Sequence, residues 1–537
     1  MDYQLNVPAI LRRGEQLFGH KEIVTRLPDR SWHRYTYAEF AARARQLAAA
    51  LRNELGLGDG DRVATLCWNH YQHLEAYIGV PTGGLVTHTL NLRLHPEDLT
   101  YIARHAGDRV LIADKVLWPL CENFVGGCGF DHLVAVGDGP TPEGAIEYED
   151  LVASAEPEDL PEREIDERDA AAMCFTSGTT GRPKGAVYSH RAIAIHSLAA
   201  AMAGALSITE KDTVLPVVPM FHANAWGFPF TCTLVGAKQV LPGPFLDAES
   251  LLEAFAAERV TITAGVPTIW LGILNELDAN PGKHDVSSIR CMVVGGSAAP
   301  QSMIEAFEKR HGLEVLHAWG MTETCPLGSV SEPTTLELAL SEDEQYRYRA
   351  KQGIPAPFFE IRARGAEGLV PWDGESMGEL EVRGVWVSSR YHESPESSDR
   401  WTEDGWFKTG DVVTIEPHGY IEIQDRAKDL VKSGGEWIST VALENALMGH
   451  PAVAEAAVIA IPDEKWQERP LAVVVLKPGE SASTEELREH LAPQFAKWWL
   501  PDRFEFVEEI PKTAVGKFRK TALREQFAAE HVEAEAV

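Results

Sequence analysis

Short apolar runs alternate with stretches of helical spacing along the first part of the chain. Thr36 and Glu39 form a capping box, and the Ala/Leu-rich run that follows to Leu55 has the period of an amphipathic helix. Helical spacing returns at residues 74–85. Apolar runs predict buried strands at residues 62–68, 110–113 and 170–175. This alternation predicts a layered α/β body.

The same alternation continues beyond residue 200. Strands are expected at residues 213–218, 239–241, 262–265 and 291–294, with helical stretches between them. The longest apolar stretch, around residues 192–208, contains His196 and many alanines, which favours a core helix over a membrane span. Residues 139–169 are rich in Pro, Glu and Asp, and we expect a surface connector there.

The pattern changes near Glu379. Apolar alternation at residues 378–387 and 412–423 predicts strands of a smaller β-rich portion, joined by a polar loop at 392–404. The charged segment from Asp425 to Asp429 then separates this body from the last part of the chain. We therefore predict two domains, residues 1–425 and residues 426–537.

The smaller second domain has a pattern of its own. Residues 441–448 have helical spacing, and residues 453–461 and 471–477 read as strands. Ser483 and Glu486 form a second capping box. We expect the acidic tail beyond Glu525 to be frayed.

Net charge narrows the classes of partner. Apolar residues make up 45% and charged residues 24% of the chain, as in an ordinary globular protein, but the formal net charge is −31. Nucleic acids and anionic membranes attract basic surfaces, so neither is expected as a partner. Any anionic ligand must be met by local lysines and arginines.

The seven cysteines are scattered, without a C-x-x-C pair or a zinc-like spacing. We expect them to be reduced thiols of a cytoplasmic protein. The N-terminus has no basic-then-apolar signal pattern, and stable membrane insertion is not expected.

A glycine- and hydroxyl-rich segment carries the strongest chemical signal. Residues 174–185 read C-F-T-S-G-T-T-G-R-P-K-G. Glycines let backbone N–H groups form a concavity for phosphate oxygens, and the hydroxyls and Lys184 add donors and positive charge. A Walker A loop is excluded, because Gly178 and Gly181 have two residues between them and Gly185 follows the lysine. A plain polar turn between a strand and a helix is the alternative.

Two further segments follow predicted strands. Phe221-His222-Ala223-Asn224-Ala225-Trp226 places a histidine between aromatics, where it would line a nucleotide or acyl pocket or pack in the core. The small residues from Gly295 to Pro300 would let a flat ring approach the backbone.

Two acidic residues and one lysine complete the set of candidate residues. Glu323, in H-A-W-G-M-T-E-T, either holds Mg²⁺ between phosphate oxygens or satisfies a helix N-terminus. Asp411, in T-G-D, either accepts ribose hydroxyl protons or lies in a turn. Lys517, at the end of P-K-T-A-V-G-K, is by itself typical of a solvated charge.

Taken together, these segments resemble the adenylate-forming superfamily of acyl-CoA synthetases, firefly luciferases and nonribosomal-peptide adenylation domains. They occur in the order and spacing of that superfamily across nearly the whole chain. P-M-F-H-A-N-A-W (219–226) and K-S-G-G-E-W-I-S (432–439) look like bacterial fatty acyl-CoA synthetases. H-A-W-G-M-T-E (317–323) is especially similar to methylmercaptopropionate-CoA ligases.

The resemblance implies a fold and a reaction. The fold would be a large N-terminal domain of layered α/β subdomains with a small β-barrel-like part, followed by a small mobile α+β C-terminal domain. The reaction would convert a carboxylate, ATP and coenzyme A into acyl-CoA, AMP and pyrophosphate through an acyl-AMP, with Mg²⁺. The acid would be a short- or medium-chain fatty acid or 3-methylmercaptopropionate. The alternatives are a long-chain fatty acyl-CoA synthetase, an adenylation module that loads a carrier protein, and a binding protein without catalysis. A homodimer is what the fatty acyl relatives suggest.

The resemblance also implies which residues hold the nucleotide. The phosphates of ATP would lie against Thr176, Ser177, Gly178, Thr179, Thr180, Gly181 and Lys184. Thr176 and Glu323 would be near Mg²⁺, and Asp411 and Arg426 would hold the ribose. The adenine would be surrounded by Gly295, Gly296, Ser297, Ala298, His317, Ala318, Trp319, Gly320, Met321 and Thr322.

Lys517 would bridge the attacking carboxylate and the α-phosphate, because a cation between two anions lowers their repulsion. His222 would lie near the reacting carboxylate, with Trp226 as a possible gate of the acyl pocket. The residues implied to line that pocket are His222, Trp226, Gly296, Trp319 and Pro326.

The family alternates its small domain between two orientations, and Lys428 falls at the hinge position. Rotation would withdraw Lys517 and bring Gly434, Gly435, Glu436 and Trp437 over the site, leaving a slot for pantetheine. Local positive potential would come from Lys184, Arg426, Lys428, Lys432 and Lys517.

Overall fold

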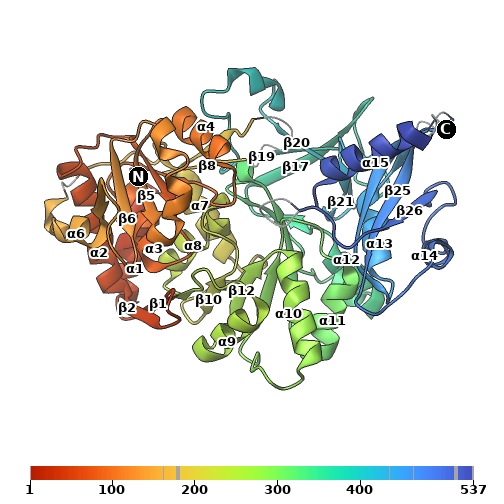
Figure 1. The fold of residues 1–537 in the computed structure, drawn as a ribbon, viewed down its shortest axis with the longest axis horizontal. Coiled ribbons are helices and arrows are strands. Elements are labelled where there is room, and N and C mark those ends of the chain that lie inside the picture. The colour runs from red at the N-terminus through yellow and green to blue at the C-terminus, as the bar shows by residue number, and fades with distance from the viewer. Residues whose placement is uncertain are drawn as a thin grey trace.

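The computed structural model describes residues 2–160, 163–176, 182–433, 436–463, 465–512 and 518–534. The described chain forms four β-sheets with helices packed on them. Figure 1 shows the N-terminal elements in red and orange at one end and the C-terminal unit in blue at the other, with the yellow and green elements between them.

The first sheet has seven strands, and five of its six strand pairs are parallel. Its order is β7 (Ala145–Glu147), β6 (His132–Val136), β5 (Asp108–Asp114), β3 (Arg62–Leu66), β4 (Val86–Thr89), β8 (Ala170–Phe175) and β9 (Gly185–Ser189). Since β8 and β9 are antiparallel neighbours, the glycine-rich segment connects two strands at the edge of this sheet. The alternative of a turn leading into a helix was therefore wrong.

Helices cover this first sheet. They are α2 (Tyr37–Asn53), α3 (Tyr71–Thr82), α4 (Pro96–Ala106), α5 (Trp118–Cys121) and α6 (Tyr148–Ala153). The predicted capping box is present at the start of α2, where the Thr36 side chain accepts from the Glu39 N–H and Glu39 accepts from the Thr36 N–H.

The second sheet has nine strands. Its order is β16 (Ile354–Pro355), β15 (Leu327–Val330), β14 (Val315–Gly320), β13 (Cys291–Val294), β12 (Ile262–Gly265), β10 (Thr213–Pro216), β11 (Lys238–Leu241), β1 (Glu22–Arg26) and β2 (Trp32–Thr36). Strands β10, β12, β13 and β14 are parallel neighbours. Their carboxyl ends share one edge, and this brings residues 219–226, 295–300 and 320–324 together.

The helices of this region are α1 (Val7–Phe18), α7 (His190–Ala201), α8 (Phe228–Val235), α9 (Ala248–Glu258), α10 (Pro267–Ala279), α11 (Gln301–His311) and α12 (Glu342–Ala350). The expected core helix at 192–208 is α7, which ends seven residues earlier than expected. Among the described residues, no helix combines the length and apolar character needed to cross a bilayer.

The third sheet is antiparallel throughout and corresponds to the predicted β-rich portion. Its order is β18 (Gly368–Leu369), β17 (Phe359–Gly365), β19 (Gly378–Gly384), β20 (Phe407–Ile415) and β21 (Ile421–Arg426). The strand expected at 412–423 is in fact two strands, because a turn with Gly419 at φ 90° reverses the chain. Asp411 and Arg426 are direct partners across this hairpin.

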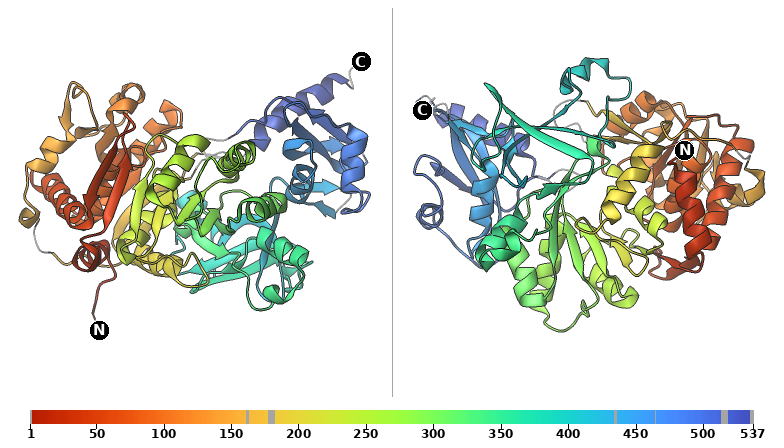
Figure 2. Two further views of the ribbon diagram at one scale, coloured as in Figure 1. Left: turned by 90° about the horizontal axis from the view of Figure 1, so that it is seen from below. Right: turned by 180° about the vertical axis from the view of Figure 1, so that it is seen from behind.

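The fourth sheet forms the C-terminal unit. Its order is β23 (Glu436–Ile438), β22 (Val431–Ser433), β25 (Gln467–Leu476) and β24 (Val453–Asp463), with β26 (Arg503–Phe506) paired to β25. Its helices are α13 (Thr440–Met448), α14 (Thr484–Leu491) and α15 (Lys520–Ala534). Figure 2 shows this unit at the end opposite the N-terminus from two further directions. The predicted fold class, a large layered N-terminal domain and a small α+β C-terminal domain, is confirmed.

Two expectations about irregular segments were wrong. Residues 139–169 are more than a connector, because they contain β7 and α6. Tyr148 of α6 is fully buried and donates to Glu75 Oε2 at 2.7 Å, which gives that segment a place in the core. The tail beyond Glu525 continues α15 to Ala534, and the buried Leu523 and Phe527 anchor that helix.

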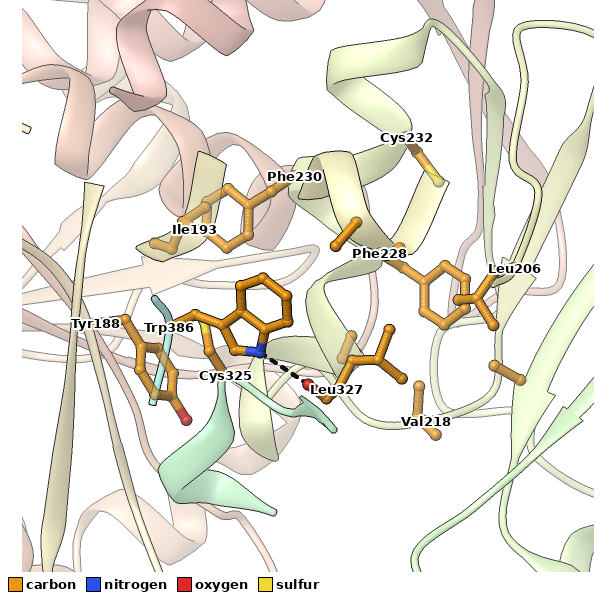
Figure 3. Packing of buried hydrophobic residues seen from close by; sticks show 14 of the residues in the cluster. Tyr188, Ile193, Leu206, Val218, Phe228, Phe230, Cys232, Cys325, Leu327 and Trp386 are labelled. Atoms are coloured by element: carbon orange, nitrogen blue, oxygen red, sulfur yellow. Dashed lines mark hydrogen bonds between the residues drawn. The ribbon is translucent and has the colours of Figure 1, made fainter. Parts of the chain in front are cut away.

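A buried core around Trp386 joins three of the sheets (Figure 3). Its indole Nε1 donates to the Leu327 carbonyl at the start of β15, at 2.8 Å. Tyr188 of β9 belongs to the same core, and Phe228 and Phe230 of α8 pack beside it. Burying large aromatic side chains is strongly favourable, so this core fixes how the sheets meet. All seven cysteines are free thiols.

Two helical glycines give opposite predictions for stability. A Cβ at Gly79 in α3 would lie 2.5 Å from the Ala44 carbonyl oxygen of α2, whereas a Cβ at Gly272 in α10 would meet nothing within 4 Å. We expect Gly79→Ala to destabilise the fold by about 1–3 kcal/mol through overpacking. The matched variant Gly272→Ala is expected to stabilise it by about 0.5–1 kcal/mol. Thermal unfolding measures both, and equal midpoints would contradict the tight α2–α3 contact.

Candidate functional site

A cavity of about 1400 Å³ lies between the second and third sheets and the C-terminal unit. Many of the predicted site residues line it: Thr176, Lys184, His222, Trp226, Gly295, Gly296, Ser297, Ala298, His317, Ala318, Trp319, Gly320, Met321, Thr322, Glu323, Pro326, Asp411, Arg426 and Lys428. Lys432 and Trp437 do not line it and face each other across the β22–β23 hairpin. Ser177 to Gly181, Gly434, Gly435 and Lys517 lie outside the described residues.

The two ends of the glycine-rich segment are held together at the cavity wall. The Thr176 N–H donates to the Lys184 carbonyl at 2.9 Å, and the Lys184 N–H donates to Thr176 Oγ1 at 3.2 Å. The Lys184 ammonium lies 5.3 Å from the ring centre of Tyr391, a favourable cation–π distance. A hydroxyl and an ammonium group are thus placed where an anionic ligand would enter.

Glu323 is almost fully buried, yet its carboxylate faces the cavity. The Tyr391 hydroxyl donates to Glu323 Oε1, and the backbone around it is fixed by the Ser388 N–H, which donates to the Glu323 carbonyl at 2.8 Å. Burial and the Glu323 carboxylate raise the pKa of Tyr391 well above its usual value, so the hydroxyl stays protonated and remains a donor. The carboxylate is oriented before any ligand binds.

Small residues line the part of the cavity between Trp226 and Pro326. A Cβ at Gly295 would come within 3.0 Å of the Trp226 ring, and a Cβ at Gly320 would lie 2.0 Å from the Pro326 carbonyl oxygen. Neither position tolerates a side chain without movement of its neighbours. His317 is hydrogen-bonded through Nδ1 to the Ala350 carbonyl at 2.9 Å, and burial lowers its pKa to about 4. The His317 imidazole is therefore uncharged at pH 7 where it lines the cavity.

Asp411 is held at both carboxylate oxygens. The Trp319 indole donates to Oδ2 at 3.1 Å, and Arg426 Nε lies 2.8 Å from Oδ1. Only 2% of Asp411 is exposed, so a buried acid is paired with a cation and a donor, as its charge requires. The pair joins β20 to β21 at the rim where the C-terminal unit begins.

The His222 end of the cavity is apolar and has a strained backbone. Ala223, Asn224, Ala225 and Trp226 have successive positive φ values of 43°, 54°, 46° and 55°. Such values are costly for residues with a Cβ, and a run of them occurs where the surroundings enforce it. Beyond Trp226, apolar side chains continue the lining: Ala200, Leu206, Phe228 and Leu271.

The C-terminal unit also reaches this cavity. Lys512 and Phe518 form an isolated β-bridge on either side of residues 513–517, and both line the cavity. The Lys520 side chain is 12% exposed, and its Nζ lies 2.7 Å from Glu444 Oε1. Burial raises the pKa of Glu444 to about 7. Burial lowers the pKa of Lys520, but the Glu444 and Asp425 carboxylates raise it by more. The pKa therefore lies above its usual value, and the ammonium stays charged.

The cavity residues that sequence reasoning missed include Tyr391, Arg400 and Lys520. Tyr391 and Arg400 come from the segment between β19 and β20, where the only sequence signal was polarity. Lys520 follows the P-K-T-A-V-G-K segment closely, but a lysine at the start of a helix resembles any solvated charge. The partners of Tyr391 and Lys520, which are Glu323 and Glu444, are distant in sequence, so no local pattern identifies these two residues.

Two protein-family models match most of this chain. Residues 12–392 match the family model described as AMP-binding enzyme, and residues 442–517 match the AMP-binding enzyme C-terminal domain. A long-chain-fatty-acid–CoA ligase from Thermus thermophilus is 51% identical over 98% of this chain and 96% of its own length. A medium-chain-fatty-acid–CoA ligase from Ectopseudomonas oleovorans is 42% identical, covering 98% of this chain and 97% of its own.

A 3-methylmercaptopropionyl-CoA ligase from Ruegeria pomeroyi is also 42% identical, covering 98% of both chains. Among solved structures, an anthranilate CoA ligase in complex with anthranoyl-AMP superposes with a TM-score of 0.87 at 28% identity, covering 98% of this chain and 99% of its own. These matches confirm the predicted resemblance to adenylate-forming enzymes and the predicted class of acid–thiol ligase. The chain belongs to the AMP-binding enzyme family.

Proposed function

We propose that this protein joins an aliphatic carboxylic acid to coenzyme A at the expense of ATP, releasing AMP and pyrophosphate. The observation that carries this proposal is the composition of one cavity. It contains the ends of the glycine-rich segment, the oriented Glu323 carboxylate, the Asp411–Arg426 pair and the base of the 513–517 segment. The phosphates and ribose of ATP, the acid and Lys517 would meet there.

In the first half-reaction a carboxylate oxygen attacks the α-phosphorus of ATP, the bond to the β-phosphate oxygen breaks, and pyrophosphate leaves. Lys184 would hold phosphate oxygens, and Lys517 would stand between the two anions that must approach each other. Thr176 and Glu323 offer a hydroxyl and a carboxylate, the oxygen donors that Mg²⁺ prefers, and the ion would supply charge neutralisation at the phosphates.

The nucleoside would be recognised by preformed groups. Asp411 is anchored by Trp319 and Arg426, so its carboxylate would accept ribose hydroxyl protons without first reorganising. The neutral His317 and the glycines of residues 295–296 would lie against the adenine ring, because they present a wall without charge or bulk.

In the second half-reaction the thiolate of coenzyme A attacks the acyl carbon and AMP leaves. The described arrangement fits the first half-reaction, since Lys512 and Phe518 line the cavity while Lys432 and Trp437 do not. A rotation at Lys428 would exchange these two surfaces and place the 432–437 hairpin over the acyl-AMP.

The preferred acid is proposed to be a short- or medium-chain aliphatic acid, including one with a thioether such as 3-methylmercaptopropionate. The bulky Trp226 beside Gly295 limits the space near the reacting carboxylate.

A long-chain acid is the second candidate. It is favoured by the 51% identical relative and by the lining that continues past Trp226 to Ala200 and Leu206. We further propose that the protein acts in the cytoplasm as a homodimer.

Acid-dependent AMP release, measured with ATP, Mg²⁺ and coenzyme A across acids from acetate to palmitate and 3-methylmercaptopropionate, tests the proposal. We expect a peak at short to medium length. Trp226→Ala should shift the peak toward longer acids, because it opens the passage to Leu206, whereas the distant Trp498→Ala should leave the profile unchanged. A wild-type peak at palmitate would establish the second candidate, and no release with any acid would refute the ligase.

Lys517→Ala is expected to lower acyl-AMP formation by about three orders of magnitude or more, while thioester formation from supplied acyl-AMP stays within a few-fold of the unmodified protein. The reason is that the lysine would act only before the rotation. Each half-reaction is measured separately, with Lys497→Ala as a charge-removal control in the same domain. Equal loss in both half-reactions would contradict the rotation.

Tyr391→Phe removes the hydroxyl that orients Glu323 and keeps the ring beneath Lys184. A hydrogen bond to a charged group contributes about 1.5–3 kcal/mol, so we expect roughly a 10- to 100-fold higher Mg²⁺ concentration at half-maximal AMP release. The control is Tyr420→Phe, which loses a hydroxyl bond to the Glu332 carbonyl outside the cavity. An unchanged Mg²⁺ dependence would remove Glu323 from the proposed metal site.

A further inference from the structure

Three side chains that the proposed reaction does not use come together beside the first sheet. His105 lies on α4, and His392 and Glu393 lie in the segment between β19 and β20 that approaches this helix (Figure 1). One ligand-capable atom of each lies within 4.8 Å of the other two. We propose that these residues form a binding site for a divalent transition-metal ion such as Zn²⁺.

The local structure holds the three groups in place. The His392 N–H donates to the Gly185 carbonyl at 2.8 Å, which fixes its backbone against β9. The His105 ring is packed edge-on against Tyr101 and Phe175, with centroid distances of 5.4 and 5.9 Å. Glu393 has a φ of 44°, a costly conformation for a residue with a side chain. The chain thus maintains a strained residue where its carboxylate joins two imidazoles.

One polar atom of this cluster lacks a partner. Nδ1 of His105 is buried and, within the described parts of the chain, makes no hydrogen bond. An unsatisfied buried polar atom costs about 1–3 kcal/mol, and a ligand that engages the imidazole would offset part of that cost. The His105 and His392 rings are 5.9 Å apart between centroids, so both can turn toward a shared ion.

The donor set decides the class of ion. Two imidazoles and one carboxylate suit Zn²⁺, Co²⁺, Ni²⁺ and Fe²⁺, whereas Mg²⁺ and Ca²⁺ prefer oxygen donors throughout. Glu393 is exposed and His392 is half-buried, so the ion has access from solvent and water can complete its coordination.

In a second cluster of possible metal ligands, the polar atoms already have hydrogen-bond partners within the protein. Cys67, His70 and Asp114 are equally close together, but His70 Nε2 lies 2.6 Å from Asp114 Oδ1. Its Nδ1 accepts from the His73 N–H at 3.2 Å, and Asp114 Oδ2 accepts from the Trp68 N–H at 2.9 Å. A metal bound through His70 Nε2 and Asp114 Oδ1 would have to replace the hydrogen bond that joins these two atoms. Among the described residues, no hydrogen bond joins the side chains of His105, His392 and Glu393 to one another.

A metal ion at this site would connect α4 with the segment at Tyr391 and His392, which lies against β9. Tyr391 pairs with Ala186 of β9 in an isolated β-bridge, and His392 follows directly. A metal held by His105 and His392 would therefore cross-link α4 to this bridge. Because an ion that binds the folded state and not the unfolded state raises stability, the melting temperature should rise with metal concentration.

The test uses the full-length protein freed of metal with a chelator. Zn²⁺ titration by calorimetry should show one site, Co²⁺ should give visible d–d absorption, and Zn²⁺ should raise the melting temperature. His105→Ala and His392→Ala should each weaken Zn²⁺ binding at least tenfold and abolish the other two signals. His311→Ala is the matched control, since this histidine is also partly exposed and paired with an acid, Asp278, far from the cluster. It should leave all three signals unchanged.

Glu393→Gln provides a second, nearly isosteric variant in case an alanine variant fails to fold. It should also weaken Zn²⁺ binding about tenfold, because a neutral amide replaces an anionic ligand. A hundredfold excess of Mg²⁺ should not displace Zn²⁺. The inference is wrong if the unmodified protein binds no Zn²⁺, or if His392→Ala and Glu393→Gln bind it as tightly as the unmodified protein does.

Discussion

The buried core around Trp386 is the interaction on which the cavity depends. Its indole donates to the Leu327 carbonyl of the second sheet, while its ring packs among residues of the first and second sheets and lies just past the end of β19 in the third. Because this core joins the sheets, the carboxyl ends of β12, β13 and β14 face the β8–β9 edge and the β20–β21 hairpin. Without that junction, Glu323 and Thr176 would have no common cavity to line.

The cavity is lined by several positively charged side chains, although the protein as a whole is strongly negative. The chain carries a formal charge of −31, yet Lys184, Arg426 and Lys428 line the cavity. Two of the acids there have partners in place, namely Tyr391 for Glu323 and Arg426 for Asp411. Preorganised partners of this kind lower the cost of binding an anionic nucleotide, since little rearrangement remains when it arrives.

A network of buried polar side chains lies where the third sheet meets the C-terminal unit. Asp425, at the end of β21, accepts the Thr440 N–H of α13 at 3.0 Å, and Lys520 lies in the same buried network with Glu444. Ion pairs and hydrogen bonds that cross between the domains are costly to bury and favourable only in a good geometry, so they can select one orientation. The network accounts for how the small domain is held with Lys512 and Phe518 at the cavity.

Local patterns in the sequence were sufficient for many of the strands and helices and for the order of a large and a small domain, and the motif resemblance named many of the residues that line the cavity. The capping box at Thr36 and Glu39, the glycine at position 320 and the strand-ending motifs depend on neighbours in the chain, so their spacing carries the signal. Tertiary structure alone decided the pairs Tyr391–Glu323, Lys520–Glu444 and His105–His392, because their members are 68, 76 and 287 positions apart. Contacts over such separations leave no periodicity in one sequence, and only the packing of the sheets brings them together.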